Sequence, residues 1–89
     1  MPRGKRQVIK DRVLAARNDS DRALIRLHEL RVIFEPDHPE YLPLIDAMAQ
    51  MQFMFQVSLG DFFLHAWGRR PPEFPKFPQD TLEEDKNAP

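Results

Sequence analysis

The sequence predicts an all-α protein: a helical hairpin of two long antiparallel helices that assembles as a homodimeric four-helix bundle. Proline is absent from two long stretches, 3–35 and 44–70. Because proline costs about 3 kcal/mol inside a helix, helices can run in these stretches. Apolar residues recur in both at steps of three and four, as on one face of a helix. The connection between the stretches is short, which favours antiparallel neighbours.

Composition narrows the protein class. The chain has 89 residues, of which 42% are hydrophobic and 30% charged, so we expect one small soluble domain. It contains no cysteine, which excludes disulfide frameworks, thiolate zinc sites, iron–sulfur clusters and cysteine nucleophiles. No apolar signal core follows the first residues, so we expect no secretory leader and a cytoplasmic location.

The first helix is predicted over about 6–34, after a flexible basic N-terminus at 1–5. Its apolar stripe has one small polar interruption and consists of Ile9, Val13, Ala16, Ser20, Ala23, Leu27, Leu30 and Phe34. Short polar side chains at 18–20 compete for backbone hydrogen bonds and are good N-caps. Two interpretations are therefore open. We favour one long helix over a mobile basic arm followed by a helix that begins near residue 20.

The segment 35–40 is expected to end the first helix and prepare the second. Asp37 and Glu40 have the spacing of a capping box. Pro39 falls in the first turn, where its missing N–H is not needed. Pro43 either kinks a helix that begins at 38 or marks a later start.

The second helix, predicted over about 40–67, is apolar over most of its circumference. One heptad-like seam contains Leu44, Met48, Met51, Phe55, Phe62 and His65, and many further apolar residues lie around the helix. A hairpin covers only one stripe of each helix, so something else must cover the rest. Polar residues interrupt the segment too often for a membrane span. Gly60–Asp61 could divide the helix, and Gly68 is expected to end it.

Association is the expected source of stability. The ordered part of about fifty to sixty residues is a size at which one core is marginal without a disulfide or a metal. We expect the second helices of two copies to pack together, and a partner protein to bind the same kind of surface. The residues expected at the oligomer or partner interface are Met48, Met51, Phe53, Phe55, Phe62, Phe63, Trp67, Phe74 and Phe77.

Residues 69–89 are predicted to form a Pro-rich and then acidic tail, partly disordered. Over 71–78 the many prolines favour an extended, polyproline-like backbone. Phe74 and Phe77 then face the same way, and they either pack back over the bundle or dock into a partner. An Arg-x-x-Pro-x-x-Pro spacing that begins at Arg69 suits a polyproline-binding groove.

The sequence predicts no catalytic site, metal site or cofactor. Asp61 and His65 can pair across one helical turn, but no nucleophile or second ligand pair accompanies them. Glu35 and His38 spell the Glu-x-x-His motif of di-iron bundles, but a helix boundary spoils their common projection. We therefore expect a non-catalytic protein–protein interaction module, which is an adaptor, an assembly chaperone or an inhibitor.

The uneven charge distribution along the chain suggests an alternative function. Residues 1–31 hold nine Lys/Arg and four acidic residues, net +5, and residues 32–89 hold four and ten, net −6. A basic first helix in a dimeric DNA- or RNA-binding regulator would contact phosphates through Arg6, Lys10 and Arg17. Acidic residues interrupt this helix, and no aromatic residue between 1 and 33 stacks a base, so the interaction module is preferred.

Overall fold

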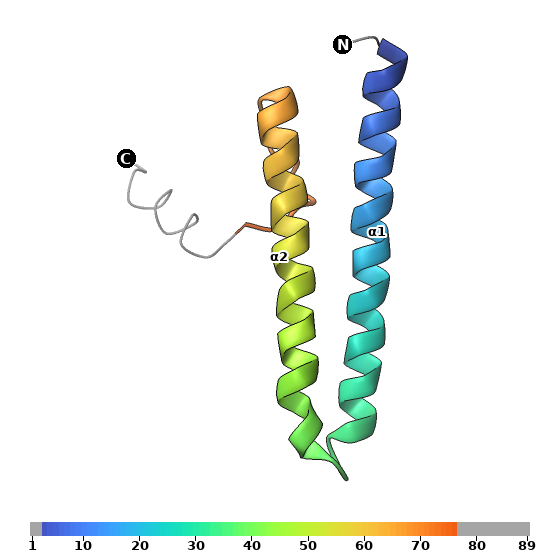
Figure 1. Ribbon diagram of the computed structural model, residues 1–89, viewed down its shortest axis with the longest axis vertical. Coiled ribbons are helices and arrows are strands. Elements are labelled where there is room, and N and C mark those ends of the chain that lie inside the picture. The colour runs from blue at the N-terminus through green and yellow to red at the C-terminus, as the bar shows by residue number, and fades with distance from the viewer. Residues whose placement is uncertain (1–2, 77–89) are drawn as a thin grey trace, which may run out of the picture. The chain divides into compact units, whose positions relative to one another are not determined.

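The computed structural model describes residues 3–76, all of them in helices, turns and short connections (Figure 1). Helix α1 spans Arg3–Phe34, a short 3-10 helix η1 spans Pro39–Tyr41, and α2 spans Leu42–Trp67. No strand occurs among the described residues. The two long helices pack against each other, so the predicted all-α hairpin is confirmed.

Helix α1 runs without a break through the polar residues at 18–20, so the single-helix interpretation is confirmed. Two of these side chains, those of Asp19 and Ser20, bond to other side chains. The Asp19 carboxylate pairs with Arg22 at 3.0 Å on the helix surface. The Ser20 hydroxyl donates to the Gln52 side-chain oxygen at 2.7 Å. Neither side chain therefore acts as the N-cap of a later helix.

The predicted capping box is wrong. The residue before η1 is His38 rather than Asp37, and no side-chain hydrogen bond caps this helix. The Glu40 carboxylate lies 3.1 Å from the side-chain Nδ1 of His38, so it contacts the ring of the residue before η1 and not a backbone N–H, as a capping box requires. Pro39 occupies the first turn of η1, as expected.

Aromatic rings pack together at the turn. The centroids of Phe34 and Tyr41 lie 5.1 Å apart in an edge arrangement. The His38 ring lies 6.4 Å from Phe34 and 5.8 Å from Tyr41. Pro43 is the second residue of α2, where a missing N–H leaves no helical hydrogen bond unmade, so α2 starts later than residue 40.

The chain divides after Phe55 into two compact units, unit 1 (1–55) and unit 2 (56–89). In unit 1, α1 and the first half of α2 run antiparallel (Figure 1). Ile45 of α2 is only 4% exposed. Near the turn, the Arg31 guanidinium donates to the Asp46 carboxylate at 2.8 Å and ties the two helices together.

Unit 2 contains the second half of α2, which Gly60–Asp61 do not interrupt. Gly68 has a φ of 78° and its N–H bonds to the Leu64 carbonyl at 2.9 Å, the expected helix-ending glycine. The following residues, 68–76, are here called the return segment. Within it the Phe74 N–H donates to the Pro71 carbonyl at 3.2 Å, so a turn interrupts the expected extended backbone. The remaining tail, including Phe77, lies outside the described residues.

Candidate interaction surface

The α2 seam is exposed along unit 1. Leu44, Met48, Met51 and Phe55 are 62%, 43%, 68% and 45% exposed, respectively. The more buried stripe of this part of α2 lies one position further along the helix and contains the buried Ile45 and the half-buried Ala49 and Gln52. In unit 1 the hairpin thus covers one stripe of α2 and leaves a second apolar stripe open.

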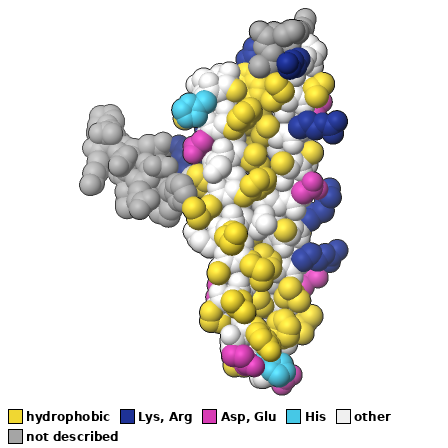
Figure 2. Space-filling view, in the orientation of Figure 1, with side chains coloured by type: hydrophobic (Ala, Val, Ile, Leu, Met, Phe, Trp, Pro, Cys, Tyr) yellow, Lys and Arg dark blue, Asp and Glu magenta, His cyan; other side chains and the backbone are white. Residues whose placement is uncertain are grey.

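A groove runs between this seam and α1 within unit 1. It consists of two adjoining hollows of ≈ 470 and ≈ 320 Å³ that share Ala23, Met51 and Gln52. The remaining lining residues are Ala16, Asp19, Ser20, Arg26, Leu27, Met48 and Phe55. Figure 2 shows a band of hydrophobic side chains on this face of the protein. This surface is here called the unit 1 groove.

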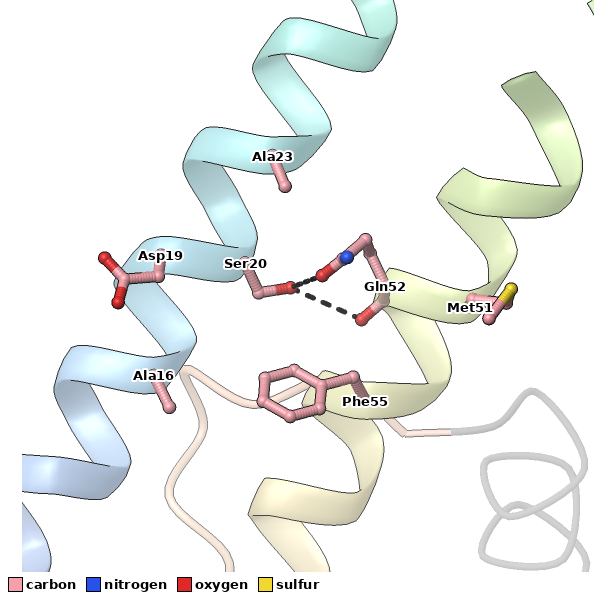
Figure 3. Close-up of a pocket in the computed structure, with 7 residues that line it drawn as sticks. All are labelled: Ala16, Asp19, Ser20, Ala23, Met51, Gln52 and Phe55. Carbon is pink, nitrogen blue, oxygen red and sulfur yellow. Dashed lines mark hydrogen bonds between the residues drawn. The ribbon is translucent and has the colours of Figure 1, made fainter. Parts of the chain in front are cut away.

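A polar pair crosses the unit 1 groove. Ser20 is 4% exposed, and its Oγ donates to Gln52 Oε1 at 2.7 Å and lies 3.5 Å from the Gln52 carbonyl oxygen (Figure 3). The Gln52 Nε2 group makes no hydrogen bond to the described part of the chain. Below the pair in Figure 3, the Phe55 ring extends from α2 toward Ala16. The groove is therefore apolar around one hydrogen-bonded centre that keeps an unused amide donor.

Charged residues border the groove on α1. Asp19 pairs with Arg22, and Arg26 pairs with Glu29, each at 3.0 Å. All four side chains are at least half exposed. Figure 2 shows basic and acidic side chains following one another along this edge. The two groove-lining members are Asp19 and Arg26, which carry opposite charges.

Aromatic residues of unit 2 cluster on one another. Phe63 is 6% exposed and Phe74 3% exposed, and their ring centroids are 5.3 Å apart. Trp67 lies 4.8 Å from Phe63 and 5.9 Å from Phe62. Phe62 remains 45% exposed. Phe63 and Phe74 are thus already buried in their own chain, so unit 2 offers a smaller apolar surface than the sequence suggests.

Arg70 fastens the return segment to α2. Its guanidinium donates to the Val57 carbonyl at 3.2 and 3.3 Å and to the Pro75 carbonyl at 2.9 Å. It also pairs with the Asp61 carboxylate. Asp61 therefore pairs with Arg70 instead of His65. The Arg70 side chain is only 9% exposed, whereas the Asp61 side chain is 52% exposed, so the guanidinium is shielded from water and the carboxylate is not.

The remaining predicted contact residues differ in their exposure to solvent. Phe53 is half-buried. Arg6 is exposed, whereas Lys10 and Arg17 are half-buried. Arg17 pairs with Asp21 at 3.7 Å, one helical turn further on.

Sequence reasoning missed Gln52 and Arg70 as structural residues. Gln52 counted only as a polar interruption of an apolar helix, although Ser20 interrupts the α1 stripe in the same way. Two polar interruptions on helices predicted to be antiparallel are a signal for a cross-helix hydrogen bond. Arg70 had no comparable signal, because its carbonyl partners are backbone groups that every residue has.

Neither a metal site, a membrane-spanning helix nor a related protein identifies a function for the described residues. Within residues 3–76, no group of three or more His, Asp or Glu side chains is placed to hold a metal ion. No helix in that range has both the length and the apolar character needed to cross a membrane. No protein-family model, curated protein or solved structure matches the chain.

Proposed function

We propose that this chain is a non-catalytic protein–protein interaction module, which is an adaptor, an assembly chaperone or an inhibitor, and that it works as a homodimer. The unit 1 groove takes a second copy of the chain, so that two hairpins form a four-helix bundle. One observation carries this proposal: the apolar seam of α2 from Leu44 to Phe55 stays exposed after the hairpin has formed.

The exposed apolar area is close to the apolar area that a homodimer interface buries, which supports the proposal. If a fully exposed Leu, Met or Phe presents about 200 Å², the four seam residues leave about 440 Å² of mostly apolar surface per chain. A standard interface buries about 800 Å² per partner, of which about 65% is apolar in homodimers, or about 520 Å². Ala16, Ala23 and Leu27 on the α1 side of the groove are half-buried and add to this area.

Spacing also favours a helical occupant. The α1 stripe and the α2 seam both alternate steps of four and three, the period at which helices pack side by side in bundles. A second copy brings two such helices at once. Methionine suits this surface because its flexible side chain fills irregular gaps.

The partner protein of the adaptor has a separate surface in this proposal. Phe62 and Leu64 of unit 2 are each 45% exposed, and a dimer presents two copies of them. Aromatic residues, Phe among them, are enriched at protein interfaces. Residues 62 and 64 project from nearly opposite sides of α2, so we assign the captured partner to Phe62 and the second copy to the unit 1 groove.

Molar mass in solution by light scattering tests the proposal. We expect twice the chain mass for the native protein and one chain mass for Met51→Asp, because the charge would be buried in the bundle. Gln50→Asp is the matched control, since Gln50 is exposed and does not line the groove, and it should remain dimeric. A native chain that is monomeric at high concentration, melts cooperatively and binds no hydrophobic dye would contradict the proposal.

A further inference from the structure

We infer that the two copies pair antiparallel, with a two-fold axis that crosses the unit 1 groove at right angles to the helices, between Met51 and Gln52. In this arrangement α1 lies beside α1 of the second copy, and α2 beside α2 of the second copy. The inference rests on the homodimer proposed above and adds the orientation, the register and the residues at the axis.

The groove lining is centred on one level of the hairpin. On α2 it runs from Met48 to Phe55, so its midpoint falls between residues 51 and 52. On α1 the charged lining residues are Asp19 and Arg26, whose midpoint falls between residues 22 and 23. Both midpoints lie near the level where Ser20 bonds Gln52, so one axis can serve both helices. Rotation about it places Met48 against Phe55 of the second copy.

The border charges are complementary under the same rotation. Asp19 of one copy comes opposite Arg26 of the other, and the symmetry makes this contact twice. Each of these residues keeps its own intrachain partner, Arg22 or Glu29, at 3.0 Å. The dimer therefore joins two existing ion pairs into one network on each edge. In a parallel two-fold arrangement, α1 of each copy faces α2 of the other, so Asp19 and Arg26 do not come opposite each other and this network does not form.

The polar pair Ser20–Gln52 is also complementary to its copy across the two-fold axis. Gln52 lies within one residue of the axis, so the two Gln52 side chains meet there. The Nε2 donor left unused in one copy reaches the Oε1 of the other, which still has a free lone pair after accepting from Ser20. A single buried polar layer can set the register and orientation of a helical bundle, because any shift leaves its groups unpaired.

Disulfide cross-linking tests the orientation directly, since the natural chain has no cysteine. In the antiparallel dimer, the two copies of Met51→Cys lie next to the axis and close to disulfide reach. The two copies of Leu44→Cys lie about 22 Å apart along the helices, at 1.5 Å per residue. We expect Met51→Cys to oxidise to a covalent dimer about a hundredfold faster than Leu44→Cys, because adjacent thiols have millimolar effective concentration.

A mixture of Met48→Cys and Phe55→Cys is expected to form the mixed dimer in preference to either self-linked dimer. Cross-linking in 6 M guanidinium, where all variants should react alike, is the control for thiol reactivity. Equal cross-linking of Leu44→Cys and Met51→Cys in the folded dimer would overturn the antiparallel arrangement. A folded dimer that cross-links at neither position would place the interface elsewhere. Both results are compatible with the proposed homodimer, whereas a monomeric molar mass in solution would contradict the homodimer itself.

The role of the polar layer has its own test. In a Gln52→Leu background, we expect the dimer to persist and the cross-linking of Leu44→Cys to rise toward that of Met51→Cys, because the register is no longer specified. Gln50→Leu makes the same chemical change outside the groove and should leave the ratio unchanged. An unchanged ratio in both backgrounds would show that Gln52 does not set the register.

Discussion

Replacing Gly60 with alanine is expected to open the return segment of unit 2. The added Cβ would lie 2.8 Å from Phe74 Cβ and would also overlap the Arg70 guanidinium. Arg70 is held by carbonyl oxygens on both sides, so it has no free direction in which to move. Phe74 and Arg70 must therefore leave their positions on α2.

The magnitude follows from two opposing effects. A glycine in a helix interior is normally about 1 kcal/mol worse than alanine, so the substitution alone would stabilise α2. Phe74 is 3% exposed, and releasing one buried Phe costs about 1.5–3 kcal/mol. The expected result is a net loss of about 0.5–2 kcal/mol in the free energy of unfolding, where each 1 kcal/mol lowers Tm by about 4–8 °C in a domain of this size.

Trp67 reports the opening, because it is the one tryptophan of the chain and its ring contacts Phe63, which in turn contacts Phe74. We expect a red-shifted Trp67 emission in Gly60→Ala at temperatures where circular dichroism still shows native helix content. Phe74→Ala should produce the same shift without the steric overlap. Gly4→Ala is the control, because no atom lies within 4 Å of the added Cβ, and it should not lower Tm. A higher Tm with unchanged emission in Gly60→Ala would refute this account of the return segment.

Two further predictions concern charge. Asp19→Arg should weaken the proposed dimer, and the double variant Asp19→Arg/Arg26→Asp should recover part of the lost affinity. The expected coupling is about 0.4–2 kcal/mol for two exposed pairs, measured from the dimer Kd by dilution. The double variant does not restore the intrachain pairs, so an absence of recovery would contradict the proposed contacts between Asp19 and Arg26 of the two copies. For the alternative function, binding to duplex DNA or RNA at two salt concentrations should show a steep salt dependence that is lost when glutamate replaces Arg6, Lys10 and Arg17; binding that is absent or ignores these changes supports the interaction module.

The helices could be predicted from local chemistry. Proline placement and the four–three stripe are enough to locate α1 and α2, and Gly68 ends α2 for a local backbone reason. The continuity of α1 through 18–20 was harder to predict, because the Ser20 side chain bonds to Gln52 of the other helix, a partner that depends on the tertiary fold. The capping box failed for a local reason, because the Glu40 carboxylate lies 3.1 Å from the His38 side chain, two residues before it.

The exposed seam was predictable only in part. Counting apolar stripes on α2 shows that one hairpin cannot cover them all, but it does not tell which stripe faces α1. The structure places Ile45 toward the core and Leu44 outside, one position apart on the helix. The burial of Phe74 against Phe63 depends on a turn within a Pro-rich segment, where composition favours an extended backbone.

Residue size explains why the unit 1 groove exists and why a second copy suits it. The middle of the α1 stripe carries only small side chains, Ala16, Ser20 and Ala23, whereas the facing seam carries Met51 and Phe55. Small residues opposite large ones leave space along α1, and protein interiors do not keep such space empty. On the proposed axis, the large side chains of one α2 lie beside those of the other and project toward the small residues of both α1 helices. Small side chains on α1 opposite large ones on α2 thus leave a groove in the single hairpin, and the same arrangement fills the core of the dimer. Substituting a large residue at Ala23 should therefore exclude the second copy without disturbing the hairpin.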